Sequence, residues 1–525
     1  EMSVVEPFLL VEQVEAFCSS DQLSPEPLRE RINHLLSQNS FITAYSDSFL
    51  SRATFLHRVC INKKVTLEII QFLLDAFPGA ANTTTNWLCP GKEDGNYPRP
   101  TVAYPLHFAC HNDNCPDSII ELLYLTAAVE ILKMLLEVNP QSVLEAVDND
   151  TDSLQIHCAT GLGRKSPQFC KILIDAYPES MTNAIHGRFP FHSACCHGSA
   201  DTVKYLFDSY PEIIMVDSIG TLPIHCACYG QGQLDTVKYL FDLYPEGISM
   251  SDHDGMLPLH HAALWSGYGE TNAEIIEFLL SQDPAGASKN STRYHRLPLH
   301  WACAGCATLT PVQLLFDAYP EAIIHTVNER EQTPLDIARA PPADEWQVKD
   351  SNVITYLESQ LVYARQAQDT SLMTTPDDNG WLPLHHALKN NASLGSIKLL
   401  VKGNPLAAQV ADNHLSFPLH IACEYSTVGV VKFLSELYRR VLNHRDENKN
   451  SPLHYACRGG NCDVVKFLLE IHVPSVSERN DSNKLPVHLL CEREDGMDNE
   501  SPEYIEAIWL LLLAYPETVL DFRLF

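Results

Sequence analysis

The sequence predicts an all-α fold, a solenoid of about twelve helix-turn-helix units. Two observations support this prediction: one short motif recurs along most of the chain, and Tyr-Pro-Glu or a variant of it closes most copies. Residues 221–246, TLPIHCACYGQGQLDTVKYLFDLYPE, show the whole unit. Its first helix opens with Leu-Pro-Ile-His, and its second ends at Tyr-Pro-Glu because proline cannot continue a helix.

An anchoring histidine marks each unit, and Asp336 takes its place in one of them. From His157 onward most steps between anchoring positions are 33 to 36 residues, with exceptions of 40 before His300 and 49 before His385. The first two steps are 50 residues each. Repeats of this length each hold one supersecondary unit, so the longer steps predict insertions. The anchoring histidines are His57, His107, His157, His192, His225, His260, His300, His385, His420, His454 and His488.

The residues within one unit have physical reasons for their positions. Pro223 suits the first helical position, because its φ is preset and its missing N–H would have no partner there. Ala227, two residues after the anchoring histidine, lets neighbouring helices approach closely. Val237 and Leu240 form an apolar face on the second helix. Asp-Gly and Asn-Gly pairs then suit the tight turn that leads to the next unit.

These motifs resemble the ankyrin repeat family. The matching segments are YPLHFAC at 104–110, TPLDIA at 333–338, SPLHYAC at 451–457 and the second-helix run VVKFLL at 464–469, and the resemblance covers roughly residues 51–525. The chain departs from the family where Leu or Phe replaces the usual Thr before the proline, and where Tyr-Pro-Glu replaces Gly-Ala-Asp. Leu and Phe cannot cap a helix with a side-chain hydrogen bond. We therefore expect a divergent subtype of the repeat.

The repeat pattern predicts four segments. Residues 1–50 lack the motif and predict an N-terminal helical cap, with a separate recognition module as the alternative. Residues 51–340 form a first block of repeats, with insertions near 81–104 and 116–139. Residues 341–380 form an irregular insertion with a long helix at Asn352–Ala367, where we expect a bend. Residues 381–525 form a second block.

Charge and cysteine content limit the classes of partner and compartment. The net charge of −30 disfavours nucleic acid and anionic membranes as partners, and it fits either basic partners or simple solubility. The stretch Ile119–Val138 carries four charged residues, so it predicts an amphipathic helix and no membrane span. The start, Glu1-Met2-Ser3, predicts no signal peptide. Eight of the 17 cysteines recur three residues after the anchoring position, too far apart to bridge, which predicts a reducing cytoplasmic or nuclear location.

No catalytic or cofactor motif stands out, so we expect no enzyme activity, no cofactor and no metal. Cys303-x-x-Cys306 with His300, and the run Cys195-Cys196-His197 with His192, could suggest zinc. A structural zinc site needs four converging ligands, whereas these residues recur as part of the repeat. Gly161–Ser166 is only faintly similar to a phosphate-binding loop, because no strand is expected before it.

The resemblance implies a binding surface on the concave side of the solenoid. In the ankyrin family the turn tips and the residues after the Ala-Cys pair face the groove, while the residue after the histidine packs between repeats. Phe108, Trp301 and Tyr455 are therefore expected to be packing residues. Aromatic and arginine side chains are common interface anchors, although they could also be scattered surface residues. The candidate partner-binding residues are Tyr229, Leu264, Trp265, Tyr425, Arg458, Met256, Tyr294, Arg296, Trp381 and His414.

The function expected from these features is a non-catalytic scaffold or adaptor that binds a protein partner along the concave groove. The alternative is the targeting or substrate-recognition region of a larger enzyme complex of ligase or kinase type. A third hypothesis places a small molecule or metal in the irregular regions 81–140 or 341–380. The sequence does not name the partner.

Overall fold

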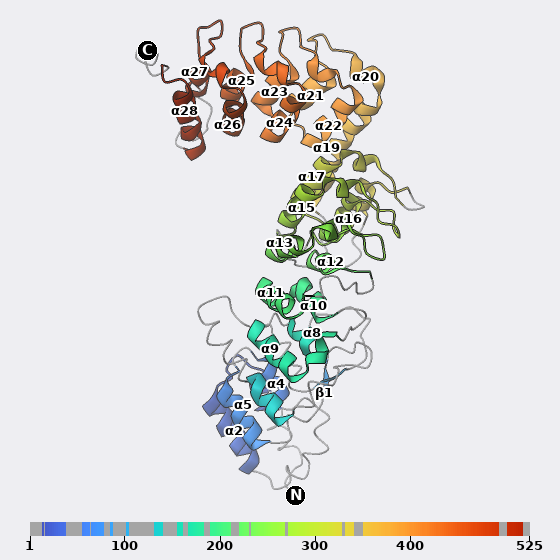
Figure 1. The fold of residues 1–525 in the computed structure, drawn as a ribbon, viewed down its shortest axis with the longest axis vertical. Helices are drawn as coiled ribbons and strands as arrows, with labels where there is room; N and C mark the ends of the chain where they lie inside the picture. The colour runs from blue at the N-terminus through green and yellow to red at the C-terminus, as the bar shows by residue number, and fades with distance from the viewer. Residues whose placement is uncertain are drawn as a thin grey trace. The chain divides into compact units, whose positions relative to one another are not determined.

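A computed structural model describes the chain over 13–14, 16–37, 55–62, 65–77, 85–87, 101–103, 131–139, 155–160, 166–182, 189–211, 220–229, 233–267, 271–327, 331–340, 350–492 and 501–517. The chain divides into two compact units, residues 1–279 and 280–525. Residues 341–380, where we expected a bend, belong to the second unit, and the four segment boundaries remain predictions. Each unit is described by itself below (Figure 1).

The first unit consists of paired helices and one small hairpin. The first helices α8, α10, α12 and α14 pack in sequence, and the second helices α9, α11 and α13 lie beside them. The insertion at 81–104 contains a two-stranded antiparallel sheet in which Asn86 pairs with Val102. The elements are α2 (Pro25–Ser37), α4 (Phe55–Ile61), α5 (Leu67–Ala76), β1 (Thr85–Trp87), β2 (Thr101–Ala103), α8 (Gln155–Thr160), α9 (Pro167–Ala176), η3 (Pro178–Thr182), α10 (Pro190–His197), α11 (Ala200–Ser209), α12 (Pro223–Ala227), α13 (Leu234–Leu243), η5 (Pro245–Ser249), α14 (Pro258–Leu264) and, across the division, α15 (Thr271–Gln282).

The second unit repeats the same pairing. Helices α21, α23, α25 and α27 stack as one row, and α22, α24, α26 and α28 form a second row packed beside it (Figure 1). The elements are η6 (Pro284–Ser288), α16 (Pro298–Ala304), α17 (Leu309–Ala318), η7 (Pro320–Ile324), α18 (Pro334–Arg339), α19 (Ser351–Gln368), α20 (Thr370–Thr374), α21 (Pro383–Lys389), α22 (Leu394–Gly403), η8 (Ala407–Gln409), α23 (Pro418–Tyr425), α24 (Val428–Leu437), η9 (Arg439–Asn443), α25 (Pro452–Gly459), α26 (Cys462–Ile471), η10 (Val473–Ser477), α27 (Pro486–Cys491) and α28 (Pro502–Ala514).

The prediction of an all-α repeat solenoid is confirmed, with one hairpin, β1–β2, among the described residues. The second helix ends at Tyr-Pro-Glu as expected, and the proline also begins a 3₁₀ turn, as Pro245 does in η5 and Pro320 in η7. The predictions for Phe108, for most of the 116–139 insertion and for Gly161–Lys165 lie outside the described residues.

The anchoring histidines bond to the residue that precedes the proline, whatever its side chain. The backbone N–H of Leu257 donates to Nδ1 of His260 at 2.9 Å. Leu257 has no side-chain cap to offer, and the N–H of His260 donates to the backbone oxygen of Leu257 at 2.9 Å. The same contact of a backbone N–H with Nδ1 joins Leu222 to His225 and Phe417 to His420, each at 3.2 Å. An N–H can only donate, so Nδ1 is unprotonated and the proton resides on Nε2.

The Nε2 of the same histidine reaches the following connection. In His225 it donates to the carbonyl oxygen of Met250 at 3.0 Å, and in His420 to that of His444 at 3.2 Å. Each of these rings therefore ties the start of its own helix to the backbone some 25 residues later. Burial lowers the pKa of His225, His300, His385, His420 and His454 to about 4, so these rings are neutral at pH 7.

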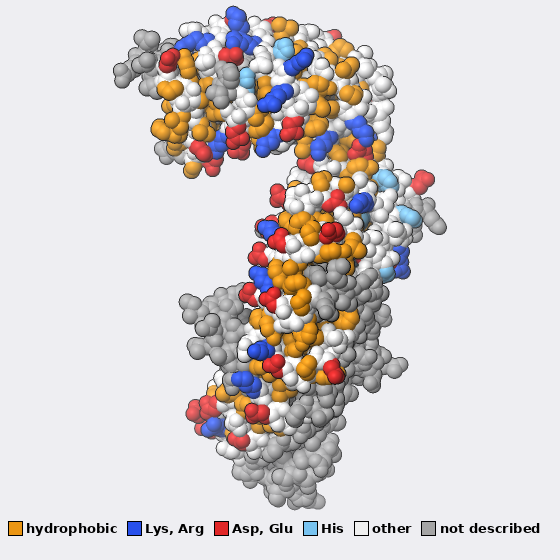
Figure 2. All heavy atoms as spheres, viewed as in Figure 1, with side chains coloured by type: hydrophobic (Ala, Val, Ile, Leu, Met, Phe, Trp, Pro, Cys, Tyr) orange, Lys and Arg blue, Asp and Glu red, His pale blue; other side chains and the backbone are white. Residues whose placement is uncertain are grey.

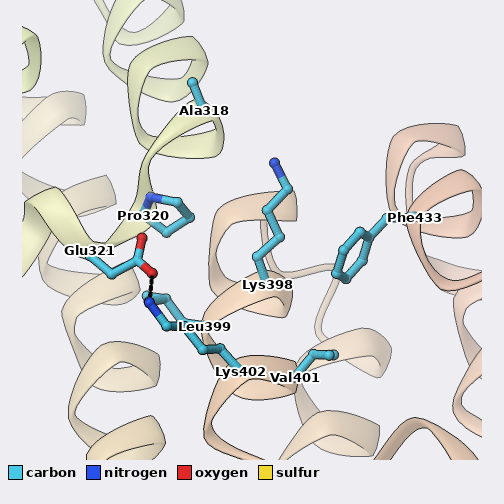
Figure 3. Close-up of a pocket in the computed structure, with 8 residues that line it drawn as sticks. All are labelled: Ala318, Pro320, Glu321, Lys398, Leu399, Val401, Lys402 and Phe433. Atoms are coloured by element: carbon cyan, nitrogen blue, oxygen red, sulfur yellow. Dashed lines mark hydrogen bonds and ion pairs between the residues drawn. The ribbon is translucent and has the colours of Figure 1, made fainter. Parts of the chain in front are cut away.

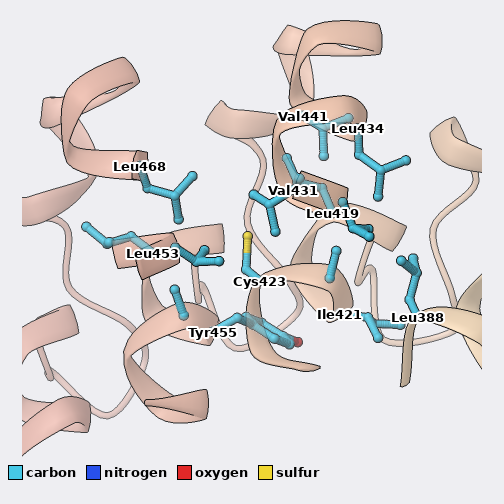
Figure 4. Close-up of a cluster of buried hydrophobic side chains, with 14 of the residues drawn as sticks. Leu388, Leu419, Ile421, Cys423, Val431, Leu434, Val441, Leu453, Tyr455 and Leu468 are labelled. Carbon is cyan, nitrogen blue, oxygen red and sulfur yellow. The ribbon is translucent and has the colours of Figure 1, made fainter. Parts of the chain in front are cut away.

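From Met373 to Leu511 the second unit has one continuous apolar cluster that runs through the stacked helices (Figure 4). Leu419, Val431 and Leu453 from three different helices contribute to it, and Cys423 fills a small space between them. Within the part of the chain that the structure describes, most of the cysteines are buried. Burial raises the pKa of the Cys60 thiol to about 12. These thiols behave as small apolar residues.

Helix α19 changes the stacking within the second unit. It is an 18-residue helix in the range where a long helix was expected, and it packs against α22 and η7. Helix α22 also contacts α17 directly, two repeats earlier. The amide of Gly395 donates to the carboxylate of Asp317 at 2.6 Å, and a Cβ on Gly395 would lie 2.6 Å from the ring of Phe316. Glycine is required here because the two helices approach so closely.

A shallow surface hollow lies beside this contact (Figure 3). It has a volume of about 330 Å³. Lys398 donates to the backbone oxygen of Asp317, and Lys402 pairs with Glu321 at one edge. Both ammonium groups are thus already engaged by the protein. The residues around the hollow are Ala318, Pro320, Glu321, Lys398, Leu399, Val401, Lys402 and Phe433.

Candidate partner-binding surface

Four turns of the second unit share one construction, and each begins eight residues before an anchoring histidine. The first residue of each turn is Asp377, Asp412, Asp446 or Asn480. Its side-chain oxygen accepts the N–H groups two and four residues later, at 2.9 and 2.7 Å in the turn of Asp412. The residue three positions on has a positive φ in every turn: 78° at Gly380, 60° at Leu415 and Lys449, and 62° at Asn483.

Neighbouring turns are also joined to one another through the backbone. The N–H of Asn413 donates to the carbonyl of Asn379 at 3.1 Å, and that of Glu447 to the carbonyl of His414 at 3.0 Å. The N–H of Asp481 continues the series to Asn448 at 2.9 Å. We call this connected edge, formed by 377–380, 412–415, 446–449 and 480–483, the turn ladder.

Charged side chains cross the turn ladder from one turn to the next. The ring of His414 lies 2.7 Å from the Glu447 carboxylate, and Lys449 pairs with Asp481. The hydrogen bond and the charge of Glu447 raise the pKa of His414. His414 is exposed, as expected for a residue at a turn tip.

Trp381 follows the first turn of the ladder and is half-buried. Its indole N–H donates to Asp412 of the next turn at 3.0 Å. Its ring contacts His386, and the ammonium of Lys389 lies 5.0 Å from its centroid. One edge of the indole is thus fixed in place, which gives a rigid aromatic side chain beside the turn ladder.

Tyr425 and Arg458 lie at the ends of neighbouring first helices. Arg458 makes two hydrogen bonds to the carboxylate of Glu424, at 3.0 and 2.5 Å, and its guanidinium stacks 4.2 Å from the ring centroid of Tyr455. Tyr425 is 43% exposed. Burial and the neighbouring Glu424 raise its pKa, so its hydroxyl is neutral at pH 7. This group offers an aromatic face next to an arginine held in a fixed orientation.

Tyr294 and Arg296 meet around a buried tryptophan in the same unit. The rings of Tyr294 and Trp301 lie edge to face with centroids 5.2 Å apart, and the Arg296 guanidinium lies 4.9 Å from the Trp301 ring. Trp301 and Tyr455 are buried, as their place after the anchoring histidine predicts. Tyr294 is exposed and is open to a partner.

The first unit brings Tyr229 and Trp265 together across neighbouring repeats, with ring centroids 4.5 Å apart. Both rings and Leu264 are half-buried. Met256 was predicted at a turn tip, but it is only 4% exposed and therefore does not line an accessible surface. Its N–H donates to Asp252 at 2.8 Å, which turns the methionine inward after the Asp-Gly turn.

The turn carboxylates are the residues that the sequence analysis missed. Asp252 accepts a hydrogen bond from His261 at 2.9 Å, Asp377 from His386 at 3.0 Å, and Asp446 from the hydroxyl of Tyr455 at 2.9 Å. Burial favours a higher pKa for Asp252, but the hydrogen bonds from His261 and Met256 outweigh it and lower the pKa. The recurrence of Asp or Asn eight residues before the anchoring histidine is the signal that could have identified these carboxylates.

The described residues contain no cluster of three or more His, Cys, Asp or Glu side chains that could hold a metal ion. Over the same ranges, each helix is too short or too polar to cross a lipid bilayer.

Comparison with known protein families identifies a family with this repeat architecture. The family described as ankyrin repeats (3 copies) matches residues 156–249, 224–326 and 384–483, which together span more than half of the chain. A search of curated proteins returned no match. Ankyrin repeats generally act as modules for interaction between proteins. The helical pairs recur, their helices stack in rows, and the family matches more than half of the chain. The chain therefore belongs to the ankyrin repeat family.

Proposed function

We propose that this chain is a non-catalytic scaffold that binds a protein partner over the side of the repeats carrying the turns and the ends of the first helices. The turn ladder is the observation that supports this most directly. Its backbone bonds fix four turns in register, so a partner would meet a surface formed before binding. A pre-formed surface loses little conformational freedom on association, which favours affinity.

The side chains along this surface suit recognition of another protein. Trp381 and Tyr425 supply rigid aromatic area, and Arg458 presents a guanidinium held by Glu424. Tryptophan, tyrosine and arginine are the residues most enriched among interface anchors. The described residues offer no comparable arrangement of nucleophile, base and pocket. The buried thiols support a reducing location, the cytoplasm or the nucleus.

Site-specific photocrosslinking tests this proposal. A benzophenone amino acid would replace Tyr425 in one version of the chain and Trp381 in another, followed by irradiation in the native lysate and mass spectrometry. The matched control carries the same group at Lys432, which is exposed on the second helix α24. We expect the same protein to crosslink from 425 and 381 and not from 432. That protein, once purified, should bind the Arg458→Glu variant at least tenfold more weakly than the wild type.

Two results would contradict the proposal. In the first, a partner crosslinks from position 432 as efficiently as from 425, which would place binding away from the turns. In the second, the purified partner binds wild type and Arg458→Glu equally. Circular dichroism of each variant checks that the helices are intact.

A further inference from the structure

The exposed face of the second helices carries a repeated charge pattern. In five of these helices a lysine lies six residues before the C-cap, the residue that directly follows the helix. An acidic residue lies four positions after each lysine. Most of these side chains are exposed, so the pairs form a polar outer face. The pairs are Lys171–Asp175, Lys204–Asp208, Lys238–Asp242, Lys432–Glu436 and Lys466–Glu470.

Helix α28 breaks this pattern at the same two positions. Its C-cap residue is Tyr515, so the lysine position is Trp509 and the acidic position is Leu513. Trp509 is 60% exposed, Leu513 56%, and Ile505 one turn earlier 55%. In Figure 2 hydrophobic side chains gather over α28, the helix at the C-terminal end of the second unit.

One side of α28 is buried against the rest of the second unit. Tyr504, Ala507 and Leu511 are buried in the core of the second unit, and α28 packs against α26 and α27. The stripe Ile505–Trp509–Leu513 lies on another side of the helix and spans about two turns, roughly 12 Å. A surface helix normally places polar residues there. Three large exposed apolar side chains in a row on that side therefore indicate a binding site for another molecule.

The charges around the stripe are acidic. Helix α28 contains Glu503 and Glu506 and neither lysine nor arginine. The ammonium of Lys466 on α26 lies 2.5 Å from the Glu506 carboxylate, so these two charges offset each other. Lys484 likewise pairs with Glu492. An apolar stripe with acidic flanks complements a helix that has an apolar face and basic edges.

We propose that the stripe Ile505–Trp509–Leu513 docks a basic amphipathic helix of a partner protein. Apolar side chains of that helix pack along the stripe, and its lysine or arginine residues face Glu503 in the first turn of α28. A second copy of this chain would bring like charges together, and an anionic membrane would meet the same acidic flanks. This site is separate from the turn ladder, so the two surfaces can be tested independently.

A defined peptide serves as the probe. It is an 18-residue fluorescein-labelled peptide of leucine and lysine, with the leucines on one helical face, and binding is followed by fluorescence anisotropy with the full chain. The key variant is Trp509→Lys/Leu513→Asp, which gives α28 the lysine–acid pair of the five second helices named above. We expect this variant to bind the probe at least tenfold more weakly. The matched control, Lys432→Ala/Glu436→Ala on α24, should bind as the wild type does.

A second variant and several control measurements test whether the stripe itself binds the probe. Ile505→Lys changes the other end of the stripe and should also weaken binding several-fold, while circular dichroism checks the fold of both variants. Equal binding by the wild type and Trp509→Lys/Leu513→Asp would overturn the proposal, as would equal binding of a scrambled peptide of the same composition. It would also be overturned if the stripe mediated self-association in sedimentation velocity or binding to phosphatidylcholine vesicles. Tighter probe binding by a chain that ends at Glu517 would show that residues 518–525 occupy the stripe instead.

Discussion

The Nε2 of His225 donates a hydrogen bond to the carbonyl oxygen of Met250 at 3.0 Å, while its Nδ1 accepts the N–H of Leu222. The ring therefore bonds to two segments of backbone only in its neutral form. His420 makes the same pair of contacts with Phe417 and His444. Protonation would place a buried positive charge next to an N–H donor, and this is costly.

We therefore expect stability to fall as the pH drops from about 6.5 to about 4. In the unfolded chain a histidine protonates near pH 6.5. In the folded chain burial lowers the pKa of five anchoring histidines to about 4. These are His225, His300, His385, His420 and His454. Between these values the unfolded state binds more protons, so acid favours unfolding. The loss should be on the order of 1–3 kcal/mol per histidine. Urea unfolding followed by circular dichroism at pH 7.5, 6 and 5 measures it, and constant stability over this range would refute the argument.

Replacing one anchoring histidine should destabilise the fold much more than replacing an exposed one. His420→Ala removes two hydrogen bonds from a fully buried site and leaves an N–H and a carbonyl without partners, at a cost of about 3 kcal/mol or more. His414→Ala, six residues earlier, removes an exposed ion pair with Glu447 and should cost less than about 1 kcal/mol. Thermal unfolding of the two variants compares them, and equal losses would contradict this explanation.

Two glycines at equivalent positions of α22 and α24 should respond in opposite directions to alanine. Gly395→Ala would place its Cβ 2.6 Å from the Phe316 ring and should destabilise the chain by about 1–3 kcal/mol. Around Gly429 the nearest atom to an added Cβ is 3.9 Å away, so Gly429→Ala should stabilise by up to about 1 kcal/mol through helix propensity. Chemical unfolding of both variants measures the difference. If Gly395→Ala were neutral, α17 and α22 would not be in close contact.

Tyr455→Phe tests the buried hydrogen bonds below the turn ladder. The Tyr455 hydroxyl donates to Asp446 at 2.9 Å and accepts from Ser416 at 2.8 Å. Its removal should cost about 1–2 kcal/mol, because the buried Asp446 carboxylate loses a donor. Tyr294→Phe, at an exposed tyrosine, is the control and should leave the unfolding free energy within about 0.5 kcal/mol of the wild type. Equal effects of the two changes would show that the Tyr455 hydroxyl is not important for stability.

The repeat pattern alone was enough to predict the order of the helices, because each unit has its own anchoring residue, proline and apolar face. The burial of Trp301 and Tyr455 followed from the same pattern. The contact between α22 and α17 could not be predicted in this way. It joins Asp317 to Gly395, 78 residues apart, and depends on how α19 packs between repeats. Met256 was predicted wrongly because its turn directs the side chain inward.

The candidate surface was less predictable than the fold. Aromatic and arginine positions could be chosen from the resemblance, but their hydrogen bonds could not. Trp381 is held by Asp412, and Arg458 by Glu424, each from a neighbouring repeat. These partners lie about one repeat away in sequence, so only the stacked structure brings them together.

The regular spacing of the turn ladder bears on the register in which a long partner would bind along the repeats. The backbone contacts that join one turn to the next are nearly identical at each step, from 3.1 Å at Asn413 to 2.9 Å at Asp481. A partner that moved by one repeat would meet the same main-chain surface again. Only the side chains distinguish one step from the next, with His414 and Glu447 at one crossing and Lys449 and Asp481 at the following one. If an extended partner binds along the ladder, we expect its alignment to depend on the order of charges there and not on the shape of the main chain.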